Sequence, residues 1–208
     1  MIDAWTALIV VDVQNDFCPG GSLAVAGGDE IVPLVNDLGK RFATVVLTQD
    51  WHPAGHSSFA SSHPGKLPFE SIAMPYGTQV LWPDHCVQGS AGAAFHPGLD
   101  LSMAQAVIRK GCHSKVDSYS GLVEADRTTP TGLGGYLRER GIARVVLAGL
   151  ATDFCISWTA QDAVRQGFET VVVEEACRAI DLDGSLDRAW AEMMALGVRR
   201  ARLTELNG

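Results

Sequence analysis

The chain has 208 residues, of which 47% are hydrophobic, and its formal net charge at pH 7 is -8. A chain of this length and apolar content can bury one substantial core, so we expect a single domain spanning residues 1–208. The negative charge and the lack of a Lys/Arg run argue against nucleic acid and anionic membranes as partners, because both require a basic surface.

Short apolar segments rich in β-branched residues alternate along the chain with segments of helical periodicity. Strands are expected at residues 7–13, 44–48, 106–109, 144–150, 170–173 and 198–203. Apolar residues at helical spacing predict amphipathic helices within residues 31–42, 156–164 and 186–194. Gly141, Gly167 and Gly197 stand where a left-handed residue would end a helix before the next strand.

The alternation of strands and helices predicts the fold class. Strands that are apolar on both faces and connected by helices form a parallel sheet that is covered on both sides. We therefore expect an α/β fold, a three-layer αβα sandwich with a central parallel sheet. Residues 51–105 interrupt the alternation and are rich in Pro, Gly, Ser and His. Long loops of this kind usually carry function.

The cysteines and the N-terminal segment indicate the compartment. Five cysteines are an odd number and form no C-x-x-C pair, so neither a disulfide framework nor a zinc ribbon is expected. The apolar run at residues 5–11 has no basic leader, and no apolar stretch approaches the about 18 residues of a membrane span. We expect reduced thiols, a cytoplasmic protein and a small-molecule substrate. The sequence is also compatible with a homo-oligomer.

Reactive side chains stand at or just after the ends of four expected strands, namely Asp12, Asp50, Lys110 and Cys155. In an open parallel sheet, ligands bind in the crevice outside the carboxyl ends of the strands. Scattered surface residues would not converge on one edge in this way. The sequence therefore predicts an enzyme.

Three of these side chains suit nucleophilic catalysis, and each has a structural alternative. Asp12 could act as a general base, or it could cap a turn through Asn15 or Asp16. Lys110 ends a buried strand and would need a carboxylate partner such as Asp12, unless it lies at the surface. Cys155 stands where a strand gives way to a helix. In a first helical turn the dipole favours a thiolate, and free N–H groups can receive an oxyanion.

A metal site is indicated by the motif Asp50-Trp51-His52 together with His85 from the long loop. In an extended backbone, side chains two residues apart lie on the same side. An aspartate with two histidines suits zinc, iron or manganese and leaves positions open for water or substrate. We predict one divalent metal ion held by Asp50, His52 and His85. His56 could be a fourth ligand, a group behind the ligands or an ordinary loop histidine.

These motifs follow one another in a specific order: Asp12-Val13-Gln14-Asn15-Asp16-Phe17 with Pro19-Gly20-Gly21, Asp50-Trp51-His52-Pro53, Trp82-Pro83-Asp84-His85-Cys86, Arg109-Lys110-Gly111, Asp117-Ser118-Tyr119-Ser120, and Gly149-Leu150-Ala151-Thr152-Asp153-Phe154-Cys155. Along nearly its whole length the chain resembles the nicotinamidase/pyrazinamidase group of the isochorismatase-like cysteine hydrolases. The resemblance implies an isochorismatase-like fold of Rossmann-like topology. It also implies that Asp12, Lys110 and Cys155 form a catalytic triad. The metal site would consist of Asp50, His52 and His85.

The resemblance further implies how a substrate would be held. The N–H groups of Ala151 and Cys155 would form an oxyanion hole, next to a cis peptide bond just before Ala151. Phe17 and Trp82 would enclose the pyridine ring, although each could equally pack within its own loop. Tyr119 would also contact the substrate.

The activity implied is hydrolysis of nicotinamide to nicotinate and ammonia through a cysteine thioester, with pyrazinamide as a further substrate and a role in NAD salvage. Isochorismatases commonly lack the nucleophilic cysteine and carbamoyl-type amidases lack the Asp-x-His motif, whereas this chain has both. A second class is a hydrolase in which a metal-bound hydroxide attacks and Cys155 is incidental. A non-enzymatic metal or redox protein would leave the convergence of Asp12 and Lys110 unexplained.

Overall fold

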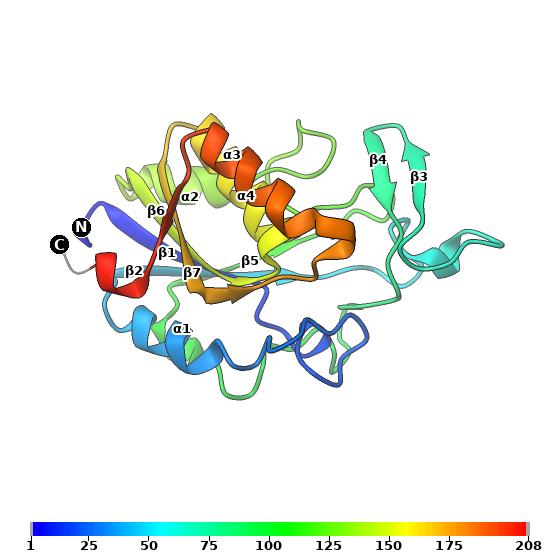
Figure 1. The fold of residues 1–208 in the computed structure, drawn as a ribbon, viewed down its shortest axis with the longest axis horizontal. Helices are drawn as coiled ribbons and strands as arrows, with labels where there is room; N and C mark the ends of the chain where they lie inside the picture. The colour runs from blue at the N-terminus through cyan, green and yellow to red at the C-terminus, as the bar shows by residue number, and fades with distance from the viewer. Residues whose placement is uncertain (1, 207–208) are drawn as a thin grey trace.

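The computed structural model describes residues 2–206 and is built around one six-stranded sheet (Figure 1). Its strands are β1 (Thr6–Val11), β2 (Thr44–Asp50), β5 (Ala106–Lys110), β6 (Arg144–Leu150), β7 (Glu169–Arg178) and β8 (Arg199–Ala201). Their order across the sheet is β5-β2-β1-β6-β7-β8, and each neighbouring pair is parallel. All the strands expected from the sequence are present.

Helices cover both faces of this sheet. Helix α1 (Val32–Gly39) lies on one face, whereas α2 (Leu133–Glu139), α3 (Ser157–Arg165) and α4 (Ser185–Ala195) lie on the other (Figure 1). The glycines predicted to end helices have positive φ angles, of 67° at Gly141, 88° at Gly167 and 95° at Gly197. The three-layer αβα sandwich expected from the sequence is confirmed.

Strand β1 shows how the core is divided. Successive residues of a strand point to opposite faces, so Leu8 and Val10 join the apolar cluster under α1, which contains Val35. Ala7 and Ile9 join the cluster under α2, α3 and α4. Because both faces of β1 are buried in apolar layers, its sequence is a continuous apolar run.

One helix and one two-stranded hairpin were not expected from the sequence. Helix α2 contains Gly134 and Gly135, and glycine lowers helix propensity by about 1 kcal/mol per residue relative to alanine. Strands β3 (Ser71–Met74) and β4 (Gly77–Val80) form an antiparallel hairpin within the long loop, at the end of the molecule opposite the termini (Figure 1). Among the described residues, no helix is long and apolar enough to cross a membrane.

The sheet brings the candidate site residues to one edge. Asp12 directly follows β1, and Asp50 and Lys110 end β2 and β5, where they are partners in register. Cys155 lies in a π-helical turn (Thr152–Ile156) that leads from β6 into α3. Four chain segments therefore deliver polar side chains to a common point beyond the strand ends.

Candidate active and metal site

Lys110 lies at the centre of the candidate site. Its Nζ is 2.9 Å from Asp12 Oδ2, 2.9 Å from Asp50 Oδ1 and 3.4 Å from Cys155 Sγ. It also donates a hydrogen bond to the main-chain oxygen of Ser118. The Lys110 and Asp12 side chains are fully buried. An ammonium with three donors among these partners is held in one place. The structure thus brings the predicted triad together, and Lys110 also joins it to Asp50.

Burial and charge set the protonation states of these groups. Burial would lower the pKa of Lys110, but the charges of Asp12 and Asp50 raise it well above its usual value, so the ammonium stays charged. Burial raises the pKa of Asp12 against the opposing charge of Lys110. It also raises the pKa of the Cys155 thiol well above its usual value. Because burial outweighs the charge of Lys110, the neutral thiol is favoured, and a base has to take its proton before the sulfur can act as a nucleophile.

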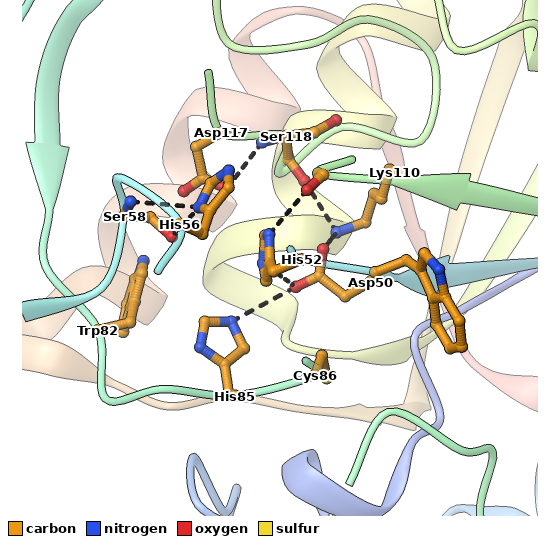
Figure 2. Close-up of polar contacts among 12 residues, drawn as sticks. Asp50, His52, His56, Ser58, Trp82, His85, Cys86, Lys110, Asp117 and Ser118 are labelled. Atoms are coloured by element: carbon orange, nitrogen blue, oxygen red, sulfur yellow. Dashed lines mark hydrogen bonds and ion pairs between the residues drawn. The ribbon is translucent and has the colours of Figure 1, made fainter. Parts of the chain in front are cut away.

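The predicted metal ligands form a second cluster, which meets Lys110 at Asp50 (Figure 2). Asp50 Oδ2 lies 3.1 Å from His52 Nε2 and 3.5 Å from His85 Nε2. The Nδ1 atoms of the two rings lie 3.0 Å from the oxygen of Gly111 and 2.8 Å from that of Pro83, respectively. Because a carbonyl oxygen can only accept, each Nδ1 carries a hydrogen, so Nε2 is the nitrogen of each ring that a metal ion could bind.

This cluster fits a divalent cation. Three acceptor atoms of Asp50, His52 and His85 face one another in a buried position. A proton on one ring would join two of these atoms, whereas a metal ion would bind all three. Burial alone would raise the pKa of Asp50, but His52 and Lys110 hold it well below its usual value, so the carboxylate is ionised. One carboxylate and two imidazoles suit zinc, iron or manganese.

His56 lies behind the ligands. Its ring packs against that of His52 with 4.3 Å between centroids. Its Nε2 is 2.9 Å from the oxygen of His113 and its Nδ1 is 2.7 Å from Ser58 Oγ, so one nitrogen donates and the other accepts (Figure 2). With both nitrogens engaged, this arrangement favours a supporting role for His56 over that of a fourth ligand.

A cavity lies beside Cys155 and Asp50. Its lining residues are Phe17, Leu23, Asp50, Trp82, His85, Asp117, Tyr119, Ala151, Phe154, Cys155 and Ile180. The structure thus places the predicted ring contacts Phe17, Trp82 and Tyr119 around the candidate nucleophile. Trp82 donates a hydrogen bond from Nε1 to the Tyr119 hydroxyl over 2.9 Å and meets Phe154 edge to face.

Sequence reasoning missed four lining residues: Leu23, Asp117, Phe154 and Ile180. Phe154 precedes Cys155, and this position next to the candidate nucleophile was the signal that could have found it. Asp117 is a buried carboxylate held by Gln79 Nε2 at 2.8 Å. Leu23 and Ile180 come from loops without any periodic pattern.

The Cys155 turn provides candidate oxyanion donors. The Leu150–Ala151 peptide bond is cis, as the resemblance implied. The resemblance implies the N–H groups of Ala151 and Cys155 as donors, and among the described residues none of the hydrogen bonds of turns, loops and caps uses the N–H of Ala151. Both donors lie in the first residues beyond β6, where a helical turn begins.

Gly111→Ala should weaken metal binding. Gly111 has a φ of +65°, and an added Cβ would meet the ring of His52. Because the ring would have to move, we expect the zinc affinity to fall by about 10–100-fold, the usual cost of disturbing the surroundings of a ligand. Competition with a chromophoric chelator measures this affinity. Gly135→Ala on α2 is the control, because nothing lies near its added Cβ, and equal affinities in the two variants would contradict the prediction.

The chain is similar to known proteins over nearly its whole length. The isochorismatase domain family matches residues 6–204. A nicotinamidase of Acinetobacter baylyi is 61% identical over 194 residues, which cover 93% of this chain and 91% of that protein. The structure of a nicotinamidase and pyrazinamidase of Acinetobacter baumanii matches with a TM-score of 0.97 at 59% identity, over 98% of this chain and 99% of the other. A pyrazinamidase of Pyrococcus horikoshii in complex with zinc matches with a TM-score of 0.78 at 36% identity, over 96% and 99% of the two chains.

Proposed function

The chain belongs to the isochorismatase domain family, and we propose that within it the protein is a nicotinamidase, an amidohydrolase that converts nicotinamide to nicotinate and ammonia. The observation that carries this proposal is the position of Lys110 Nζ, 2.9 Å from Asp12 and 3.4 Å from Cys155, beside an aromatic-lined cavity. The names of the Acinetobacter relatives support the substrate, including pyrazinamide as a second one. The same reaction would serve NAD salvage.

The first half of the reaction forms a thioester. Asp12 takes the proton of the Cys155 thiol, and the sulfur attacks the carboxamide carbon. The raised pKa of Asp12 makes it a stronger base than an exposed aspartate. Lys110 stabilises the negative charge on the sulfur, and the N–H groups of Ala151 and Cys155 receive the oxyanion. Asp12 then returns the proton to the leaving nitrogen, and ammonia departs.

The second half releases the acid. Asp12, again ionised, takes a proton from a water molecule that attacks the thioester carbon. The carbon–sulfur bond breaks, nicotinate leaves, and the Cys155 thiol regains the proton held by Asp12. Lys110 remains charged throughout, because its ammonium is paired with Asp12 and Asp50.

We propose that Asp50, His52 and His85 hold one divalent ion of zinc, iron or manganese. When bound, the ion supplies a Lewis acid at which the ring nitrogen of the substrate can bind. The zinc complex of the Pyrococcus horikoshii relative supports zinc. Phe17 and Trp82 line the cavity between this cluster and Cys155, where they can enclose a flat ring.

Chelation of the metal, or His52→Ala, should raise KM for nicotinamide far more than KM for benzamide, which lacks a ring nitrogen. A contact that is present in both ground and transition states acts as uniform binding. Some loss of kcat is also expected, because a misplaced ring misplaces the carboxamide. If a metal-bound hydroxide were the nucleophile, kcat would fall alike for both substrates.

The proposed activity is tested by measuring ammonia release from nicotinamide, benzamide and a carbamoyl amino acid under the same conditions. We expect kcat/KM to be highest for nicotinamide. Preference for the carbamoyl amino acid would overturn the proposal, and so would equal rates for nicotinamide and benzamide.

We also propose a cytoplasmic protein of one domain. All five cysteines are free thiols in the structure, which supports a reducing compartment. Strands from both ends of the described chain belong to one sheet, and this supports a single domain.

A further inference from the structure

We propose that Gln14 and Asp16 position the metal ligands Asp50 and His85 by holding the main chain at and beside them. Both residues lie in the segment that follows Asp12, and neither side chain faces the candidate ion. They are therefore positioning residues. The inference rests on the proposed metal site.

The side chain of Gln14 pairs with both peptide groups of Asp50. Its Oε1 accepts from Asp50 N–H over 2.7 Å, and its Nε2 donates to Asp50 C=O over 2.9 Å. The same Nε2 donates to the oxygen of Ala93 over 2.9 Å. Gln14 is fully buried, and all its amide hydrogens and its oxygen are used.

Gln14 takes the place of a neighbouring strand. The pairing of β1 with β2 ends at Val10 and Leu47, and the chain then turns away at Asp12, whose φ is 49°. On its other side, Asp50 remains paired with Lys110 of β5. Without Gln14, the main chain of Asp50 would be held only from the side of β5. Its position matters because its carboxylate faces both Lys110 and the two histidines.

Asp16 holds the segment that carries His85. Its Oδ2 accepts the N–H of Cys86 over 2.7 Å, directly after His85. Cys86 has a φ of 47°, a conformation that a residue with a Cβ rarely adopts. The oxygen of Cys86 in turn accepts the N–H of His52 over 3.0 Å. Asp16 thus holds Cys86, the residue that is covalently joined to His85 and hydrogen-bonded to the N–H of His52.

The alternative is that Gln14 and Asp16 only stabilise the fold. A matched control separates these roles, because Gln49 is also buried and also donates from Nε2 to the oxygen of Ala93 over 2.9 Å. Its Oε1 accepts from Arg109, whereas the side-chain hydrogen bonds to the N–H and C=O of Asp50 are those of Gln14. Gln49→Leu and Gln14→Leu therefore remove similar buried amides, and only the second releases a ligand.

The experiment uses the full chain with zinc as the probe. The zinc dissociation constant is measured by chelator competition, and the melting temperature is measured on the metal-free protein. We expect Gln14→Leu to weaken zinc binding by about 10–100-fold and to raise KM for nicotinamide more than KM for benzamide. Gln49→Leu should lower the melting temperature to a similar extent and leave the zinc affinity unchanged. Equal zinc affinities in the two variants would overturn the inference.

Two further variants keep the inference testable if Gln14→Leu does not fold. Asp16→Asn preserves the shape but leaves one acceptor where two N–H groups, of Cys86 and Ser22, need one each. Gly92→Ala places a methyl group against the Asp16 carboxylate. Both should weaken zinc binding, whereas Asn15→Ala, which removes a hydrogen bond to Ala91, should not.

Asp50→Ala distinguishes failure of the inference from failure of the proposed site. If the unmodified protein binds zinc no more tightly than Asp50→Ala, the proposed metal site itself is wrong. If Asp50→Ala loses zinc while Gln14→Leu and Asp16→Asn keep the full affinity, only the positioning roles are wrong.

Discussion

Replacing Cys155 with alanine should abolish ammonia release from nicotinamide and leave the fold intact. The change removes the sulfur that is proposed to form the thioester, and it removes little volume at Cys155, a residue that is 6% exposed. Loss of the nucleophile from a hydrolase typically lowers kcat by roughly 10⁶-fold. The ammonia assay measures the loss, and a thermal melt of the same sample verifies folding.

Cys177→Ala is the matched control for this variant. Cys177 is another buried cysteine, and burial raises the pKa of its thiol to about 12. It lies in β7 opposite Gly149 and does not line the candidate cavity. Full activity is expected in this variant. More than a trace of activity in Cys155→Ala would rule out the thioester mechanism.

Asp12→Asn should lower kcat/KM by at least the roughly 10²–10⁴-fold that a positioned acid or base contributes. An amide cannot take the proton of Cys155 or activate the water that releases nicotinate. Below its pKa Asp12 is protonated and equally inactive, so the rate of the unmodified enzyme should fall as the pH decreases through that value. Since burial raises the pKa of Asp12, this fall should occur above the usual aspartate value of 3.8.

Thr48→Val tests the assignment of the acid limb. The Thr48 hydroxyl donates to Asp12 Oδ1 over 2.7 Å and lowers the pKa of that carboxyl by stabilising its ionised form. Removing this bond should move the acid limb of the pH–rate profile to higher pH. If the rate did not fall at low pH, or if Thr48→Val did not shift that fall, Asp12 would not be the general base.

The strands and the candidate triad could be predicted because both follow from local pattern. Residues 7–10 form an unbroken apolar run whose side chains alternate between the two core clusters. In a parallel sheet, the polar residues that follow such strands lie at the same edge. The helix-ending glycines were predictable for the same reason, since each stands between a helical segment and a strand.

Other features depend on tertiary contacts that leave no pattern in the sequence. Ile180 lines the cavity from the loop that follows the end of β7 at Arg178. The raised pKa of Cys155 results from its burial, and the position of Cys155 in a helical turn does not reveal how deeply it is buried. The role of Gln14 arises only when the end of β2 lies beside the chain that leaves β1.

The most direct test is the intact mass of the protein quenched in acid during the first turnover of nicotinamide. We expect a transient mass increase of one nicotinoyl group per chain, and a digest of the same sample should place that group on the peptide that contains Cys155. This adduct should form as ammonia is released, disappear once the substrate is consumed, and be absent from Cys155→Ala. Steady formation of nicotinate by protein that carries no adduct at any quench time would contradict the thioester mechanism, and so would undiminished turnover after the thiol has been alkylated.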